Sequence, residues 1–488
     1  MAELHKLTIS ELSTRLSRGE CSSLDIVNDL LTAIDAVDSK VGAYLTLDRD
    51  SALEQARAAD AARASGKDHP MLGIPVAIKD LLNVKGQPCT CSSKILEGYT
   101  APYDATVIAR LRDAGAVLLG RVNMDEFAMG SSTENAALGK TSNPWNLGHV
   151  PGGSSGGSAA CVAADEAIAS LGSDTGGSIR QPAAFCGCVG VKPTYGRVSR
   201  YGLTAFASSL DQIGPITKTV KDSAILLETI CGLDRMDSSS IDMEVPAFSS
   251  KLGDDTSLAG VKLGLPKEYF VEGMDPEVEK AVRDAVEHCR GLGAEIVDVS
   301  LPNARYAIAV YYIIATAEAS ANLARFDGIR YGMRLDGKDP SELYAKTRAA
   351  GFGQEVKRRI ILGTYVLSSG YYDAYYLKAQ KVRTLIRDDF TEAFKQCDAI
   401  LSPVTPTAAY KKGEKTADPL KMYLDDILTT PINLAGNCAL SVPCGFTSHG
   451  MPIGLQIIGD AFQEETILKV GHAYEQSTEW HTRKPEIS

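Results

Sequence analysis

The chain has 488 residues, of which 44% are hydrophobic and 23% are charged, a composition typical of ordinary soluble globular proteins. The formal net charge is −11 and no long basic run occurs, which argues against a broad nucleic-acid-binding surface. No apolar stretch is long enough for a membrane span, and the N-terminus lacks the apolar core of a signal peptide. Eleven cysteines fit a reducing cytoplasm better than a disulfide framework. The spacing in Cys89-x-Cys91 and Cys186-x-Cys188 is not that of a zinc site.

The N-terminal segment, residues 1–65, has the pattern of helices packed on a larger body. Thr8 and Glu11 have the spacing of a capping box, and Gly19 is suited to end the first helix. A second helix is expected after Ser22 or Ser23, and a third over about 51–63. No catalytic pattern is visible here, so we expect this segment to contribute packing or a partner surface.

From residue 73 onward, short apolar segments alternate with helical patterns. Helices are expected at 106–114, 219–231 and 275–292, a long tyrosine-rich helical region at about 304–397, and strands at 73–80, 116–120, 167–172, 261–265, 294–299, 399–402, 439–442 and 454–458. This alternation predicts a layered α/β fold whose sheet is covered by helices on both faces. The segment 238–257 has the composition of a surface loop rather than a linker, so a single domain, 1–488, is expected.

Two glycine-rich turns stand out. Residues 151–158 (PGGSSGGS) precede an alanine-rich apolar segment, and residues 174–178 (DTGGS) follow a predicted strand. Glycines that lead into a helix gather backbone N–H groups where they can face an anion. Because the P-loop pattern is absent, the turns predict a serine-based active site, with one serine as nucleophile and backbone N–H groups forming an oxyanion hole.

A serine hydroxyl needs a base to accept its proton. Of the seven histidines only His149 lies near a glycine-rich turn, and no Gly-x-Ser-x-Gly elbow is present, so a Ser–His–Asp triad has no sequence support. Lys79 is the alternative base, because burial at the end of an apolar strand would lower its pKa from about 10.4 toward about 7–8. The residues alone leave open an ion pair between Lys79 and Asp80, and a helix-capping role for Ser178.

Three segments together resemble the amidase signature family, namely 73–80 (GIPVAIKD), 151–158 and 172–182 (GSDTGGSIRQP). The resemblance is dense over 73–219 and thinner toward the C-terminus. It implies one compact domain built on a large mixed sheet. It also implies a Ser–Ser–Lys set in which Ser178 is the nucleophile, Ser154 the bridging serine and Lys79 the base. The backbone groups expected to form the oxyanion hole are those of Thr175, Gly176, Gly177 and Ser178.

Within this family the chain is similar to the glutamine-hydrolysing subunits of tRNA-dependent amidotransferases, on residues 121–135, 322–328 and 369–376 (SGYYDAYY). That likeness implies a cytoplasmic heterotrimeric ligase that converts Glu-tRNA(Gln) to Gln-tRNA(Gln). The sequence leaves Asp-tRNA(Asn) open as a target, because that choice belongs to the partner subunit. This subunit would hydrolyse glutamine to glutamate and ammonia. A B subunit would bind the misacylated tRNA and use ATP and Mg²⁺, and a small C subunit would wrap the pair. No cofactor or metal is expected on this chain.

A pocket for free glutamine requires an arginine for its α-carboxylate and an acid for its α-ammonium. The resemblance points to Arg359 in preference to Arg358, and to Asp426 in preference to Asp425. Tyr312 is a further candidate. Without the resemblance, a solvated helix face would be the simpler interpretation of all three positions.

Some positions depart from the family pattern, namely Lys140, His149 and Asn437-Cys438, and none of them is a predicted catalytic residue. The main alternative function is a stand-alone amidase acting on another small amide, whose pocket would be apolar rather than charged. A catalytically inactive scaffold subunit is a second alternative, against which the intact serines and lysine argue.

Overall fold

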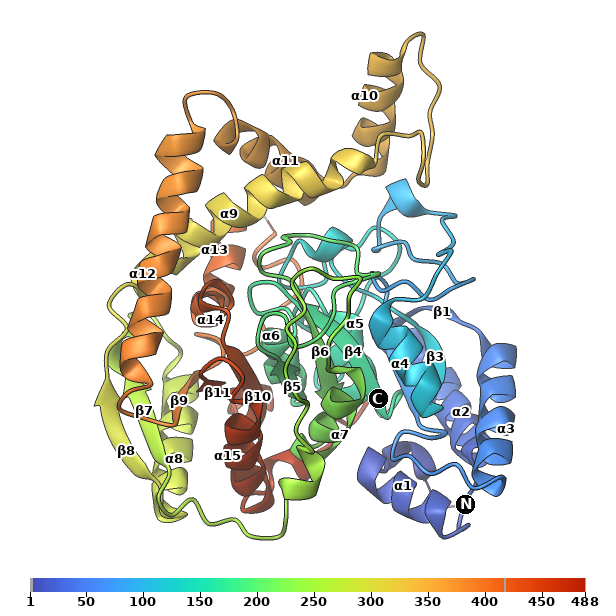
Figure 1. Cartoon of the computed structure of the whole chain (residues 1–488), viewed down its shortest axis with the longest axis vertical. Helices are drawn as coiled ribbons and strands as arrows, with labels where there is room; N and C mark the ends of the chain where they lie inside the picture. Colours follow the sequence, from blue (N-terminus) through green and yellow to red (C-terminus); the bar gives the residue numbers. More distant parts are fainter. Residues whose placement is uncertain (1–2, 417, 488) are drawn as a thin grey trace.

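The computed structural model, which describes residues 3–416 and 418–487, contains one 11-stranded mixed sheet (Figure 1). Across the sheet the strands lie in the order β1-β3-β2-β4-β6-β5-β10-β11-β9-β7-β8. The predicted α/β fold with a large mixed sheet is confirmed. In chain order the strands are β1 (Tyr44–Leu47), β2 (Pro75–Lys79), β3 (Val117–Val122), β4 (Ala169–Asp174), β5 (Val189–Lys192), β6 (Gln212–Thr217), β7 (Lys262–Pro266), β8 (Glu295–Val299), β9 (Ala399–Pro403), β10 (Cys438–Phe446) and β11 (Pro452–Gly459).

Parallel pairing is confined to two parts of the sheet. Strand β2 pairs in parallel with β3 and β4, and β7 pairs in parallel with β8 and β9. Parallel neighbours need a crossover connection. Helix α4 (Thr106–Ala114) connects β2 to β3, the chain passes from β3 through α5 (Gly156–Ala163) to β4 on the other side of β2, and α8 (Pro276–Gly291) connects β7 to β8. The β2–β4 pair brings the 73–80 and 172–182 motifs to one place.

Helices cover both faces of the sheet. A Cβ at Gly454 of β11 would meet Ala184 of α6 (Arg180–Cys186), whereas a Cβ at Gly459 would meet Ile467 of α15 (Glu464–Gln476). These glycines are an odd number of residues apart in one strand and therefore face opposite sides. The other helices are α1 (Ile9–Ser17), α2 (Ser23–Val41), α3 (Arg49–Ala64), α7 (Val220–Ile230), α9 (Ala307–Asn322), α10 (Pro340–Gly351), α11 (Gln354–Val366), α12 (Lys378–Ala393), α13 (Pro419–Tyr423) and α14 (Thr430–Ala435).

The N-terminal helices begin where their caps predict. Thr8 and Glu11 form the capping box at the start of α1, and Ser22 forms a second one with Asp25 at the start of α2. The apolar residues of α2 face inward, as its spacing predicts. These helices lie together beside β1 and β3 at the edge of the molecule (Figure 1).

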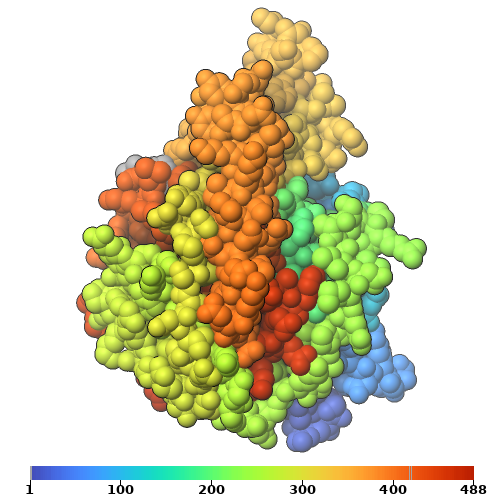
Figure 2. Space-filling view, turned by 60° about the vertical axis from the view of Figure 1, so that its left-hand side comes forward, coloured from blue at the N-terminus to red at the C-terminus, as the bar shows by residue number. Residues whose placement is uncertain are grey.

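The tyrosine-rich region is divided rather than continuous. It contains α9 to α12 and a short π-helix, η8 (Tyr372–Leu377). Pro340 begins α10, Gly353 is the N-cap of α11, and Gly370 has a left-handed φ of 84° just before η8, so backbone chemistry sets the breaks. Helix α10 projects from the body in Figure 1, and α12 forms a ridge on the face shown in Figure 2.

Helix α9 has an unusually apolar composition. With its flanking turns, Ala304–Arg325, it is long and apolar enough to cross a membrane on length and composition alone. Half of its most apolar stretch is buried, however, and α9 packs against α11, α12 and α14. This is the pattern of a helix that contributes to a protein core.

Candidate functional site

The predicted catalytic residues gather where β2 and β4 end. The two strands are parallel neighbours, with Ile78 paired to Leu171, so their carboxyl ends meet at one edge of the sheet. Lys79 is the last residue of β2, and Ser173 comes directly before Asp174, the last residue of β4. The motifs at 73–80 and 172–182 therefore meet through sheet register.

Lys79 is surrounded by serine hydroxyls. Its Nζ lies 2.8 Å from Ser154 Oγ, 2.7 Å from Ser155 Oγ and 2.9 Å from Ser173 Oγ. The side chain is completely buried, and burial lowers the pKa of Lys79 to about 7 because the charged form is disfavoured there. A lysine in this state can accept a proton near neutral pH.

The ion pair between Lys79 and Asp80 that the sequence leaves open is not formed. The Asp80 carboxylate instead accepts a hydrogen bond of 3.1 Å from Nε of Arg121, and both side chains are buried. Among the residues that the structure describes, Lys79 has no ion-pair partner. Arg121 thus neutralises the neighbouring carboxylate and leaves Lys79 free to exchange protons with serines.

Glycines allow the 151–158 loop to approach Lys79. A Cβ at Gly157 would lie 2.5 Å from backbone atoms of Asn123, and one at Gly153 would lie 2.1 Å from Oδ2 of Asp125, so neither position has space for a larger residue. The peptide bond between Gly153 and Ser154 is cis. The Asp125 N–H donates to the Ser154 carbonyl at 3.2 Å, which fixes the loop beside β2.

The second glycine-rich turn is held by a buried ion pair. The Asp174 carboxylate accepts two hydrogen bonds of 3.0 Å from the Arg180 guanidinium. It also accepts the N–H groups of Gly177 and Ile179, at 2.9 and 3.1 Å. Burial acts to raise the pKa of Asp174, but the charge and hydrogen bonds of Arg180, with the Lys192 charge and a hydrogen bond from Asn433, together outweigh it and lower this pKa to about 2. Asp174 therefore stays ionised and shapes the turn.

The structure changes one part of the predicted oxyanion hole. The N–H of Gly177 is already bonded to Asp174 and is unavailable to an oxyanion. Within the described part of the chain, the N–H groups of Thr175, Gly176 and Ser178 have no partner. The Thr429 hydroxyl donates to the Gly176 carbonyl at 2.6 Å, which orients that peptide. Thr175, Gly176 and Ser178 are therefore the candidate donors.

Ser178 follows this turn and is largely buried, with 8% of its surface exposed. It does not cap a helix, because α6 has Ile179 as its N-cap residue and no side-chain capping bond. Its hydroxyl makes no hydrogen bond to any described residue, although the Ser155 N–H donates to the Ser178 carbonyl at 3.2 Å. Lys79 thus donates a hydrogen bond to Ser154 directly, whereas the described residues show no hydrogen bond between the Ser154 and Ser178 hydroxyls.

Arg359 lies in a cage of aromatic rings. Its guanidinium is 5.2 Å from the ring centre of Tyr312, 5.4 Å from that of Tyr423 and 5.5 Å from that of Phe206. Its Nε donates to Glu355 at 2.8 Å. Arg359 is 2% exposed, which is the setting of a held, functional cation rather than of a solvated helix face.

The two alternative residues next to Arg359 and Asp426 face elsewhere. The Arg358 side chain is 44% exposed and pairs with the outer oxygen of Glu355. Asp425 forms an ion pair with Lys415. Each of these two charges thus has its own ion-pair partner, while Arg359 and Asp426 are buried.

Asp426 is a buried acid held by a hydroxyl. Its Oδ2 accepts a hydrogen bond of 2.6 Å from Ser131 Oγ. Burial raises the pKa of Asp426 to about 8, while Ser131 and the positive charge of Arg359 act in the opposite direction. The influence of Arg359 on this carboxylate places the two groups within electrostatic range. An ammonium ion beside Asp426 would restore its ionised form.

Tyr312 packs beside Arg359 and Tyr423. Its ring stacks on Tyr423 with centroids 3.9 Å apart, and the Arg359 guanidinium lies 5.2 Å from its ring centre. Its hydroxyl is buried without a hydrogen-bond partner among the described residues. A buried donor without a partner is suited to bind a polar substrate.

Sequence reasoning missed several residues that hold the site together. Glu355 accepts hydrogen bonds from Arg359 and from the Tyr423 hydroxyl, at 2.8 and 2.7 Å. Although burial acts to raise the pKa of Glu355, the Arg359 charge and these bonds lower it. The i,i+4 spacing of Glu355 and Arg359 on one helix was the signal available for this pair. No sequence signal connects Ser131 with Asp426, which are 295 residues apart.

His149 does not take part in the serine cluster. It forms an isolated bridge with Lys411 and lies at a separate hollow beside His449. Among residues 3–416 and 418–487, no group of three His, Cys, Asp or Glu side chains is arranged to hold a metal ion.

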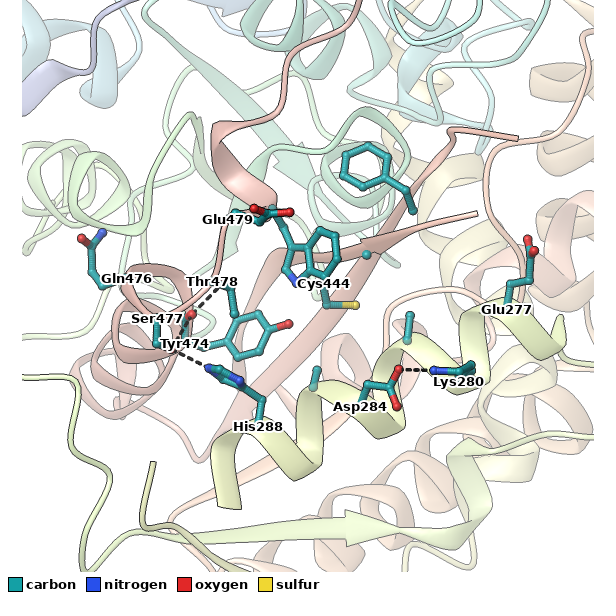
Figure 3. Close-up of a pocket in the computed structure, with 15 residues that line it drawn as sticks. Glu277, Lys280, Asp284, His288, Cys444, Tyr474, Gln476, Ser477, Thr478 and Glu479 are labelled. Atoms are coloured by element: carbon teal, nitrogen blue, oxygen red, sulfur yellow. Dashed lines mark hydrogen bonds and ion pairs between the residues drawn. The ribbon is translucent and has the colours of Figure 1, made fainter. Parts of the chain in front are cut away.

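A separate cavity lies away from these residues. It measures about 850 Å³ and is bounded by α8, the end of β10 and the end of α15 (Figure 3). Its polar side chains bond one another, as His288 does with Ser477 at 2.8 Å and Lys280 with Asp284 at 2.6 Å. None of the catalytic or pocket residues lines it, so size alone does not identify the site.

Comparison with known proteins adds the family context. The sequence profile of the family described as Amidase matches residues 25–468. The chain is 59% identical to the A subunit of glutamyl-tRNA(Gln) amidotransferase from Geobacter metallireducens, over 99% of this chain and all of that protein. It is also 59% identical to the protein of the same name from Roseiflexus castenholzii, over 100% of this chain and 99% of that protein.

Solved structures give the same relationship. The crystal structure of the glutamyl-tRNA(Gln) amidotransferase A subunit from Thermotoga maritima superposes with a TM-score of 0.83 at 42% identity, covering 100% of this chain and 99% of that one. Native peptide amidase from Stenotrophomonas maltophilia superposes with a TM-score of 0.83 at 30% identity, covering 99% and 98% of the two chains. One fold therefore serves both kinds of amidase.

Proposed function

This chain belongs to the amidase family, and we propose that it is the glutamine-hydrolysing, ammonia-generating subunit of a tRNA-dependent amidotransferase. The relatives that match it over their full length are named as the A subunit of that enzyme. The observation that carries the chemistry is the buried Lys79, which contacts the Ser154 hydroxyl at 2.8 Å and whose pKa burial lowers to about 7.

In the proposed reaction, Ser178 Oγ attacks the carboxamide carbon of glutamine. Its proton passes to Ser154 Oγ as the Ser154 proton passes to neutral Lys79. The oxyanion that forms is stabilised by the N–H groups of Thr175, Gly176 and Ser178. When the tetrahedral intermediate collapses, the C–N bond breaks, the relay returns the proton to the leaving nitrogen, and ammonia departs.

The second half of the reaction regenerates the enzyme. Water attacks the glutamyl ester on Ser178, and the relay of Ser154 and Lys79 accepts the proton of that water. Collapse of the second intermediate breaks the ester bond, and the proton returns to Ser178 Oγ. The products are glutamate and free enzyme, so the balance requires only glutamine and water.

Substrate selection is assigned to the pocket around Arg359, Asp426 and Tyr312. Arg359 would bind the α-carboxylate of glutamine and Asp426 its α-ammonium, with the Tyr312 hydroxyl as a further donor. Support comes from the burial of both charges and from the aromatic cage of Arg359. A buried cation and a buried acid within electrostatic range match the two charges of free glutamine.

The remaining chemistry is assigned to other subunits of a cytoplasmic heterotrimer. A B subunit would bind ATP, Mg²⁺ and the misacylated tRNA, and a C subunit would hold the pair together. The net charge of −11 supports this division, because a tRNA-binding surface on this chain would need clustered cations. Ammonia is then the product that this chain contributes to the conversion of Glu-tRNA(Gln).

The second candidate function is a stand-alone amidase that acts on another small amide. The shared fold of the peptide amidase favours it. A peptide or apolar amide has no free α-carboxylate and α-ammonium pair, however, so it would make no use of the buried Arg359 and Asp426. The charged pocket therefore favours glutamine.

The direct test is to trap the acyl-enzyme with an electrophilic glutamine analogue and to locate the adduct by mass spectrometry. We expect the mass increase on the peptide that carries Ser178, and none in a Ser178→Ala variant. An adduct on Ser154 or Ser155 would overturn the assignment of the nucleophile. No adduct with the glutamine analogue, together with rapid labelling by an uncharged amide analogue, would support the stand-alone amidase.

A further inference from the structure

The tyrosine-rich motif at 369–376 has no role in the catalytic site. Together with the end of α11 it forms an exposed surface, here called the tyrosine face, made of Ile361, Leu362, Tyr365, Tyr371 and Tyr375. Each of these side chains is exposed, from 39% for Tyr375 to 69% for Ile361. Contiguous apolar exposure of this kind marks an interaction surface on soluble proteins.

The three tyrosines of this face are ordered by contacts with one another. The ring of Tyr371 lies 4.4 Å from that of Tyr365 and 5.9 Å from that of Tyr375, measured between centroids. Rings that are already stacked lose little conformational entropy when a partner covers them, and tyrosine is frequent at interface hot spots. The face is therefore organised for binding before a partner arrives.

Two exposed lysines border the tyrosine face, in a chain of net charge −11. Of the arginines nearby, Arg359 is buried, and Arg358 and Arg387 pair with Glu355 and Asp388. Lys378 and Lys381 are exposed and follow Tyr375 at helical spacing. Neither lysine forms an ion pair with any residue that the structure describes. A complementary partner thus has an apolar centre and an acidic rim.

The tyrosine face is also joined to the glutamine pocket by one helix. The buried side of α11 carries Glu355 and Arg359, and the exposed side of its second half carries Ile361, Leu362 and Tyr365. Arg359 and Tyr365 are separated by roughly 9 Å along the helix axis. Figure 1 shows α11 lying above the sheet. A partner docked on this face would rest on the helix that positions Arg359.

We propose that the tyrosine face is the docking surface for the tRNA-amidating partner subunit, which would present an apolar pocket edged by Asp and Glu. This inference rests on the proposed function. A second copy of this chain is disfavoured, because a two-fold interface would bring the basic rims of both copies together. A nucleic acid is disfavoured because Ile361 and Leu362, the aliphatic part of the face, offer nothing to phosphates.

The test uses the complete complex, obtained by expressing the chain together with the other subunits of its amidotransferase. Ile361→Glu and Tyr371→Ala are compared with Met236→Glu, a matched control at a loop position that is 63% exposed. The dissociation constant of the partner subunit is measured for each variant, and thermal unfolding verifies that each variant is folded. We expect each face variant to weaken partner binding at least about tenfold and the control to change it by less than about twofold.

A charge variant tests the rim separately. Lys381→Glu should weaken partner binding and reduce its salt dependence, since an attractive charge contact is lost. If folded face variants bind the partner as tightly as the control does, the docking surface is wrong. If they bind the partner normally but lose affinity for tRNA, the face binds nucleic acid and the proposal is also overturned.

Failure of the docking inference and failure of the proposed function give different results. That function fails if the wild-type complex releases no ammonia from glutamine, however well the complex assembles. The docking inference fails if the wild-type complex forms and releases ammonia while the face variants assemble equally well.

Discussion

The edge of the sheet at Lys79 and the pocket around Arg359 are built in different ways. At the edge, strand register and glycine turns bring Lys79 and Ser154 together, and backbone atoms leave space for little else. In the pocket, side chains from separate helices hold Arg359 beside the stacked rings of Tyr312 and Tyr423. In the proposed function, residues at the edge transfer protons and residues in the pocket select the substrate. Variants of the first should therefore lower kcat, and variants of the second should raise KM.

The largest effects are expected at the sheet edge. Lys79→Ala and Ser154→Ala should each lower kcat for glutamine by roughly 10³-fold or more, with the fold retained. Because the two residues act in one relay, the double variant should be little worse than either single variant. Steady-state kinetics of the four proteins checks this. If the fold losses in kcat of the two single variants multiply in the double variant, the residues act independently. A near-normal rate for Lys79→Ala would exclude the relay.

Variants of the pocket should raise KM for glutamine. Arg359→Ala removes the cation assigned to the α-carboxylate, far from the scissile amide, and should raise KM for glutamine by roughly 10²-fold with a smaller change in kcat. Arg358→Ala is the matched control, since its side chain is exposed, and should change KM by less than about threefold. The reverse pattern would move the role to Arg358. Normal KM in both variants would favour the stand-alone amidase.

A smaller effect is expected where Glu355 supports the pocket. Glu355→Gln keeps an acceptor for the Tyr423 hydroxyl but removes the charge that orients Arg359. We expect KM for glutamine to rise about tenfold and kcat to change little. Hydrolysis of a small amide without an α-carboxylate provides the control and should be unaffected. Equal losses on both substrates would indicate general structural damage instead.

The smallest effect concerns pH. Burial lowers the pKa of Lys79 to about 7, so the neutral, proton-accepting form is lost as pH falls through that value. At saturating glutamine, kcat should fall roughly fivefold from pH 7 to pH 6 and level off above about pH 8. Burial raises the pKa of Asp426 to about 8 in the empty pocket. Saturating glutamine keeps the pocket filled, so the pH profile of kcat reports Lys79 rather than Asp426. A flat profile between pH 6 and 8 would contradict Lys79 as the base.

The two regions also differ in how far the sequence predicts them. Strand β2 and its terminal Lys79 are visible as an apolar run that ends in a charge, and the glycine-rich turns mark where backbones approach closely. Strands β5 and β6 are not predicted, because Gly190 and Pro215 interrupt their apolar pattern although both strands are buried. The ends of the tyrosine-rich helices depend on single residues such as Gly353 and Gly370.

The pocket could be named from the family resemblance, but its construction could not be derived. Ser131 and Asp426 meet only after the chain folds, as do Glu355 and Tyr423. Periodicity and spacing carry no information about such contacts, because they describe neighbours within one element. The occupation of the Gly177 N–H by Asp174 likewise follows from side-chain geometry that the DTGGS motif alone does not specify.

The most direct test of the central claim uses the assembled complex with Ser178→Ala in this chain. The variant should abolish glutamine-dependent amidation of misacylated tRNA, because the nucleophile that releases ammonia is lost. Ammonium chloride supplied directly should restore amidation to nearly the wild-type ammonia-dependent rate, since the substitution removes one oxygen from a residue that makes no side-chain hydrogen bond within the described chain. If a correctly assembled variant complex is not rescued by ammonium, or if it still uses glutamine, the ammonia-generating role assigned to this chain is contradicted.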